Sequence, residues 1–80
     1  MSYGYSARIV KLNKAADKRR LGVALGRVAI EASVPVTEIS DMLGVSRQTV
    51  YNWFIGSYDP QAKHITNINT VLAFIGNEYK

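Results

Sequence analysis

The sequence predicts an all-α domain, a compact bundle of about four to five helices. Three observations lead to this prediction. The chain has 80 residues, the size of one small domain. Apolar residues recur at three- and four-residue intervals in two long segments, one in the first half of the chain and one near its end. Between them lie two shorter apolar patterns joined at Gly44, where a tight turn is expected because glycine adopts positive φ at little cost.

The N-terminal residues 1–13 are expected to form a basic arm, followed by the helical domain over residues 14–80. Gly4 and the mixed pattern after it argue against a helix start, and an extended segment is expected over residues 8–12. Such an arm is expected to be disordered in the absence of a partner.

The first helix is expected over residues 15–33, with Asn13 as its N-cap. Gly22 and Gly26 lie four residues apart and therefore on one helix face, which predicts close packing of another helix there. Pro35 ends this helix because the residue before a proline avoids the α region. The apolar stripe consists of Leu21, Ala24, Leu25, Val28, Ala29 and Ala32.

Two short helices are expected next, over residues 37–43 and 47–55. Ser46 is predicted to cap the second of them, and Gly56 to end it. Val45 lies between the helices and is expected to fill the angle at which they cross. The inward-facing apolar residues are Ile39, Leu43, Val50, Trp53 and Phe54. For Trp53, core packing is favoured over stacking on bases, and a half-exposed Phe54 stays open as an alternative.

The last helix is expected from residue 61 or 62 to residue 75, after a loop that contains Pro60. Gly76 and Asn77 are predicted to stop it, and residues 78–80 to fray. Phe74 and Tyr79 are the apolar candidates for a dimer surface. The apolar stripe of this helix is Ile65, Ile68, Val71, Leu72 and Ile75.

The middle segment resembles the helix–turn–helix core of Cro and lambdoid-repressor (Xre-type) regulators at Ile39, Leu43, Gly44, Val45, Ser46, Arg47, Gln48, Thr49, Val50, Trp53 and Gly56. The resemblance implies a lambda-repressor-like DNA-binding domain. The chain departs from the family at Ser40, where Ala is usual, and at Val36 and Thr37, where a phosphate-contacting Gln is common.

Base reading in the major groove is expected from the outward face of the second short helix. The resemblance implies base contacts at Arg47, Gln48 and Asn52. An arginine can bond guanine O6 and N7 together, and Gln or Asn can pair with adenine N6 and N7. Contacts to the DNA backbone, or secondary contacts, are expected from Thr37, Ser46, Thr49, Tyr51, Tyr58, Arg8, Lys11, Lys14, Lys18 and Arg19.

Composition narrows the function classes. The net charge of +4 and the pI near 9.6 favour an anionic partner. The sequence holds no cysteine, a single His64 and no catalytic or metal-binding spacing, so we expect neither an enzyme nor a metal or cofactor. No signal peptide or membrane-length apolar run is present, and we expect a cytoplasmic protein of a bacterial host cell or its nucleoid.

The sequence therefore predicts a transcriptional regulator that binds double-stranded DNA, a repressor of the phage or prophage type. A pseudo-palindromic operator and a homodimer, at least on DNA, are expected partners. Two alternatives stay open: a non-catalytic protein-interaction module such as an antitoxin, and the DNA-binding module of a recombinase or transposase.

Overall fold

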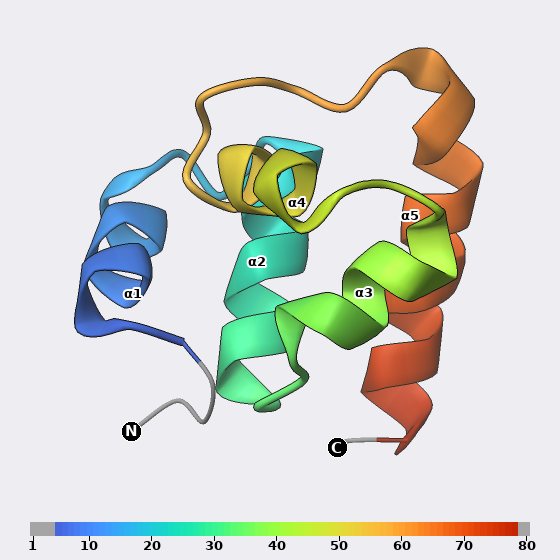
Figure 1. The fold of residues 1–80 in the computed structure, drawn as a ribbon, viewed down its shortest axis with the longest axis horizontal. Coiled ribbons are helices and arrows are strands. Elements are labelled where there is room, and N and C mark those ends of the chain that lie inside the picture. Colours follow the sequence, from blue (N-terminus) through green and yellow to red (C-terminus); the bar gives the residue numbers. More distant parts are fainter. Residues whose placement is uncertain (1–4, 79–80) are drawn as a thin grey trace.

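The computed structural model describes residues 5–78 and is made of helices joined by short loops (Figure 1). The described part of the chain contains no strand. This confirms the predicted all-α fold. The five helices are α1 (Ala7–Ala15), α2 (Leu21–Glu31), α3 (Val36–Leu43), α4 (Arg47–Phe54) and α5 (Ala62–Glu78).

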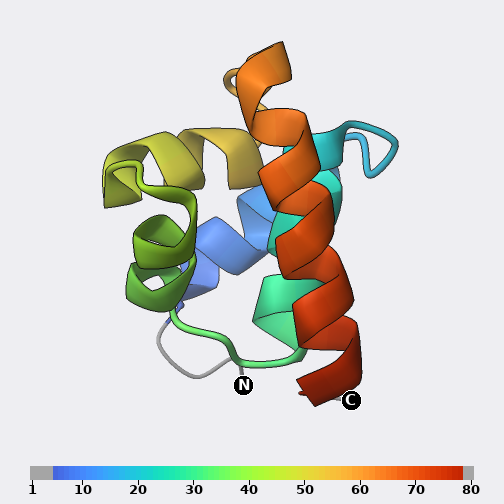
Figure 2. The ribbon, with the colours of Figure 1, turned by 90° about the vertical axis from the view of Figure 1, so that its right-hand side faces the viewer.

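The helix α2 is the centre of the bundle and packs against α1, α4 and α5. The helix α5 also packs against α3, and in Figure 2 it runs the length of the molecule with α3 and α4 together to one side. The core that these helices share holds the fully buried side chains of Leu25, Ile39, Phe54, Ile68 and Ile75. Burial of such side chains is the main source of stability for a domain of this size.

The N-terminal segment differs from the sequence-based prediction. Residues 7–15 form α1 where an extended arm was expected, and Ser6 caps this helix by accepting the Ile9 N–H at 3.2 Å. The predicted helix over 15–33 is therefore wrong at its start: residues 16–20 form a loop and α2 begins at Leu21. Asp17 turns the chain there because its side chain accepts the Arg19 N–H at 2.9 Å.

Tyr5 explains why this segment is folded rather than extended. Its side chain is buried, its hydroxyl donates to the Val34 carbonyl at 2.6 Å, and its ring centre lies 6.0 Å from that of Phe54. Residues 5–15 thus pack with the bundle. The expected arm residues Met1–Gly4 lie outside the described residues.

The predicted role of Gly22 and Gly26 is confirmed. A Cβ at Gly22 would lie 2.7 Å from Trp53 Cβ, and a Cβ at Gly26 would lie 2.7 Å from Phe54 Cγ. Only glycine allows α2 and α4 to approach this closely. The position of α4 on the bundle is therefore set by two residues of α2.

Several predicted helix ends are shifted by a few residues. The helix α2 stops at Glu31, and Ser33 takes a positive φ of 59° before Pro35 becomes the N-cap of α3. The helix α5 continues through Gly76 to Glu78, so the predicted stop at Gly76 is wrong. The expected end residues Tyr79 and Lys80 lie outside the described part of the chain.

Candidate nucleic-acid interface

The turn between α3 and α4 has the geometry that the sequence predicts. Gly44 is left-handed, with φ 67°, and the Val45 N–H bonds back to the Ser40 carbonyl at 3.1 Å. The Gly44 N–H donates to the same carbonyl, so the end of α3 is closed by two N–H groups on Ser40. Ser40 is buried at the helix crossing, where its hydroxyl donates to the Thr37 carbonyl at 2.9 Å.

Ser46 caps α4, as predicted. Its hydroxyl oxygen accepts the Thr49 N–H at 3.1 Å and lies 2.9 Å from the Thr49 hydroxyl. The cap fixes the residue at which the helix begins and therefore which side chains it presents outward.

The inner face of α4 is apolar and buried, which confirms the sequence prediction. Val50 and Phe54 have no exposed surface, and Trp53 is 4% exposed. The opposite face carries Gln48 and Asn52, which lie one helical turn apart and are joined by a bond of 3.1 Å from Gln48 Nε2 to Asn52 Oδ1.

Arg47 is exposed in the first turn of α4. The three predicted base-reading residues thus all lie on α4 outside its buried face, with Arg47 and Gln48 exposed and Asn52 half-buried. They present guanidinium and amide groups, which match the donor and acceptor pattern of base edges in the major groove.

A shallow cleft borders the Ser46 and Thr49 side of α4. It is lined by these two residues together with Tyr58, Lys63 and His64 from the following loop and the start of α5. The His64 ring stacks obliquely on Trp53, with ring centres 5.3 Å apart. Tyr58 is exposed, so three of the predicted secondary contacts lie in or beside one depression.

The other side of α4 faces the N-terminal segment. Tyr51 is half-buried there and packs against the core, which favours a packing role for its ring. Burial, with a smaller contribution from Tyr51, raises the pKa of the nearby Tyr5 hydroxyl well above its usual range. The Tyr5 hydroxyl therefore stays protonated at neutral pH.

The predicted basic contacts fall into two groups. Arg8, Lys11 and Lys14 are exposed on α1, while Lys18 and Arg19 lie in the loop before α2. Arg19 pairs with Asp17, with Arg19 Nη2 3.0 Å from Asp17 Oδ2, and this guanidinium holds the pKa of the Asp17 carboxyl below its usual range. The charge of Arg19 is therefore partly compensated within its own loop.

Thr37 is exposed in the first turn of α3. The N-cap of α3 is Pro35, so Thr37 does not cap the helix. Its side chain is at the surface on α3, whereas the three predicted base-reading residues lie on α4.

A scan against protein-family models matches residues 14–54 to the model of the homeodomain-like domain. The match covers 41 of the 80 residues, and it contains α2, α3 and α4 entirely. The chain belongs to the homeodomain-like helix–turn–helix family. This confirms the helix–turn–helix and its DNA-binding class. No curated protein and no solved structure is significantly similar to the chain.

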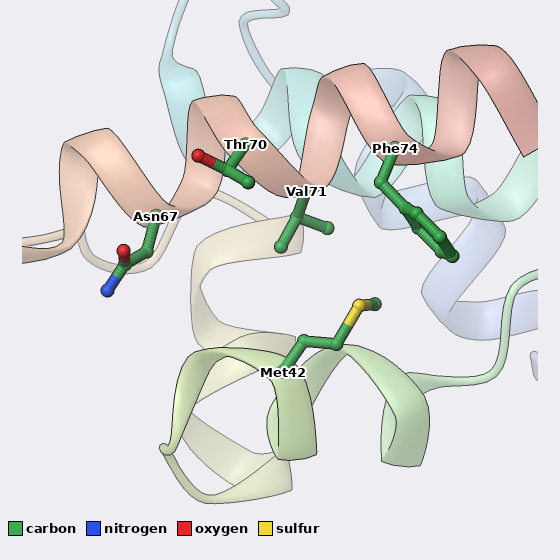
Figure 3. Close-up of a pocket in the computed structure, with 5 residues that line it drawn as sticks. All are labelled: Met42, Asn67, Thr70, Val71 and Phe74. Carbon is green, nitrogen blue, oxygen red and sulfur yellow. The ribbon is translucent and has the colours of Figure 1, made fainter.

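Most of α1 and all of α5 lie outside the matched part of this homeodomain-like domain. The helix α5 and α3 border an apolar groove lined by Met42, Val71 and Phe74, with Asn67 and Thr70 at its edge (Figure 3). Figure 3 shows the Met42 side chain directed from α3 toward α5, between Val71 and Phe74. Phe74, the predicted dimer residue, is 38% exposed there.

The described residues contain neither a candidate metal site nor a candidate membrane-spanning helix. Within residues 5–78, no three His, Cys, Asp or Glu side chains lie close enough to hold a metal ion. In the same part of the chain, none of the helices is long and apolar enough to cross a membrane.

Two residues that support α4 were missed at the sequence level. Arg20 is absent from the predicted contacts, and its Nη1 donates to the Gly56 carbonyl at 2.7 Å and its Nε to Asp59 Oδ1 at 2.7 Å. Asn13 was taken as a helix cap, but it is buried inside α1 with its amide on α4. No local pattern marks either role, because the partners lie 36 to 41 residues away.

Proposed function

We propose that the protein is a transcriptional regulator that binds double-stranded DNA at a specific sequence and reads the major groove with α4. The observation that carries this proposal is the division of α4 into two faces. Val50, Trp53 and Phe54 are buried, while Gln48 and Arg47 are exposed on the outer side. Guanidinium and amide groups on a short exposed helix are the residues that read bases in the major groove.

The surroundings of α4 support contacts with the DNA backbone on both of its flanks. Tyr58 and Lys63 border the cleft on one side, and Arg8 and Lys11 are exposed on the neighbouring α1. The helix α1 packs against α4, and in the view of Figure 1 it lies to the left of α4. The net charge of +4 supplies the sequence-independent part of such binding.

The narrower proposal is a repressor of the phage or prophage type that binds a pseudo-palindromic operator as a dimer. It rests on the resemblance of residues 39–56 to Cro and lambdoid repressors. Two α4 helices on one face of DNA would read half-sites about one helical turn apart. Sedimentation with and without an operator duplex measures whether the chain is dimeric alone, only on DNA, or not at all.

The primary test is selection from a randomised duplex library, followed by binding measurements on the selected site and on random duplex. Asn52→Ala and Arg47→Ala should each weaken binding to the selected site by about 1–3 kcal/mol and leave binding to random duplex nearly unchanged. Asn69→Ala is the matched control, because Asn69 is exposed on α5.

The outcomes separate the alternatives. Equal loss on both duplexes would remove these residues from base reading. Salt-sensitive binding with no enriched sequence would indicate a non-specific DNA binder. Absence of binding at low salt would overturn the proposal and favour a protein partner.

A further inference from the structure

Asn13 is a buried polar side chain whose hydrogen-bonding groups are all used. It is 1% exposed. Its Nδ2 donates to the Phe54 carbonyl at 2.7 Å and to the Val23 carbonyl at 3.1 Å, and its Oδ1 accepts from Arg27 Nε at 3.0 Å. Three helices therefore meet at one amide group. A buried amide with every partner present holds those partners in one arrangement, because any shift leaves a polar atom unpaired.

The contact with Phe54 matters most because Phe54 is the last residue of α4. Carbonyls in the last turn of a helix have no partner within the helix. Asn13 supplies the partner for one of them, the Phe54 carbonyl. Arg20 holds the turn that follows the helix by donating to the Gly56 carbonyl at 2.7 Å. The C-terminal end of α4 is thus fixed by two side chains that precede α2.

The space for this contact is made by Gly26. A Cβ at that position would lie 2.7 Å from Asn13 Nδ2 and 2.7 Å from Phe54 Cγ. The close approach of α2 and α4 and the amide contact therefore occur at the same point. The amide fixes how far α4 slides along α2, which the apolar contacts alone leave less strictly defined.

We propose that Asn13 is a positioning residue for DNA reading. By holding the Phe54 carbonyl, it sets the position of Asn52, two residues earlier on α4, and of Gln48, which bonds to Asn52 at 3.1 Å. Base reading requires side chains held to within about 0.5 Å. This inference rests on the proposed function of α4. Asn13 touches no DNA and acts through the position of the helix.

The test compares Asn13→Ala with Ile68→Val, a core change on α5 that keeps the hydrogen bond from Asn13 to the Phe54 carbonyl. Ile68 is fully buried, so this control lowers stability without removing that hydrogen bond. At a temperature where both variants are folded, we expect N13A to lower the ratio of specific to random-duplex affinity by about tenfold. The salt dependence of random-duplex binding should not change, because no basic residue is removed.

A second readout separates failure of this inference from failure of the proposed function. Amide hydrogen exchange in the last turn of α4 should be faster in N13A than in I68V, with or without DNA. If the wild-type chain shows no sequence preference, the proposed function falls, and the exchange rates still decide whether Asn13 positions α4.

Two results would overturn the inference: an affinity ratio in N13A that equals the I68V ratio, or exchange in α4 that is no faster than in the control. Should N13A fail to fold, Asn13→Asp is measured instead. Aspartate keeps the shape of the side chain and the bond to Arg27 but turns a carboxylate oxygen toward the Phe54 carbonyl. The same decrease in the ratio of specific to random-duplex affinity is therefore expected.

Discussion

Single polar side chains connect parts of this chain that lie far apart in the sequence. Tyr5 bonds to Val34, Asn13 to Phe54 and Arg20 to Gly56, and each bond joins the N-terminal quarter to another segment. Each is worth about 0.5–1.5 kcal/mol when formed and more when one buried partner is removed. These side chains, together with the buried apolar residues, make residues 5–20 part of the folded bundle.

Tyr5→Phe tests one of these bonds through pH. Burial raises the pKa of the Tyr5 hydroxyl in the folded protein, while the unfolded chain ionises at about pH 10. Above that pH the unfolded state binds fewer protons than the folded state, so the free energy of unfolding falls as pH rises. Y5F should lose about 0.5–1.5 kcal/mol at neutral pH and show a shallower alkaline decline. Urea unfolding at neutral pH and at about pH 11 measures both. Parallel declines in the two proteins would contradict the prediction.

The residue scale also shows which features a sequence can predict. Ser46 and Gly44 were predicted correctly because a helix cap and a left-handed turn depend on residues within one helical turn. Asn13 was misassigned because asparagine is a good N-cap and also a good buried amide. The partner that decides between these roles, Phe54, is 41 residues away. The residues next to Asn13 in the sequence do not distinguish an N-cap from a buried amide.

At the scale of elements, the contact between α2 and α4 fixes the position of α4, the helix proposed to read DNA. The spacing of Gly22 and Gly26 predicted close packing of another helix, which the structure identifies as α4. The apolar periodicity predicted the buried side of α4. It did not predict α1, whose face toward the bundle has only Ile9, Val10 and the polar Asn13. Three positions with one polar member are too weak a periodic signal for a helix.

Gly22→Ala should destabilise the protein although alanine favours a helix. The new methyl would lie 2.7 Å from Trp53 Cβ and 2.9 Å from the Trp53 carbonyl oxygen, neither of which moves freely. Overpacking of this kind costs about 1–3 kcal/mol, which exceeds the helix-propensity gain of about 0.5–1 kcal/mol. Thermal unfolding gives the difference.

Gly76→Ala is the matched control for that substitution. Gly76 also lies in a helix, but a Cβ there would have no neighbour within 4 Å. We expect a gain of up to about 0.5–1 kcal/mol from helix propensity alone. If both substitutions change the melting temperature in the same direction, close packing is not the reason for glycine at position 22.

At the scale of the whole molecule, the basic residues of α1 lie on a small bundle that also carries α4. The described chain measures 30 × 27 × 22 Å along its principal axes, so α1, α4 and the start of α5 all lie within reach of one DNA segment. The net charge of +4 is unevenly spread, with Arg8, Lys11 and Lys14 together on α1. Composition predicted the anionic partner, but only the fold shows that these charges sit on a helix that is fixed to α4.

The salt dependence of DNA binding should depend on which basic residue is removed. Lys11→Gln removes an exposed charge on α1. If Lys11 contacts a phosphate, the fall of log affinity with log salt should become shallower by about 1. Arg19→Gln should reduce the steepness of this salt dependence less, because the Asp17 carboxylate, 3.0 Å from the Arg19 guanidinium, already compensates that charge.

Titration of random duplex from low to high salt measures the salt dependence of both variants. An Arg19→Gln effect equal to that of Lys11→Gln would show that Arg19 leaves Asp17 on binding. An unchanged slope in Lys11→Gln would place α1 away from the DNA.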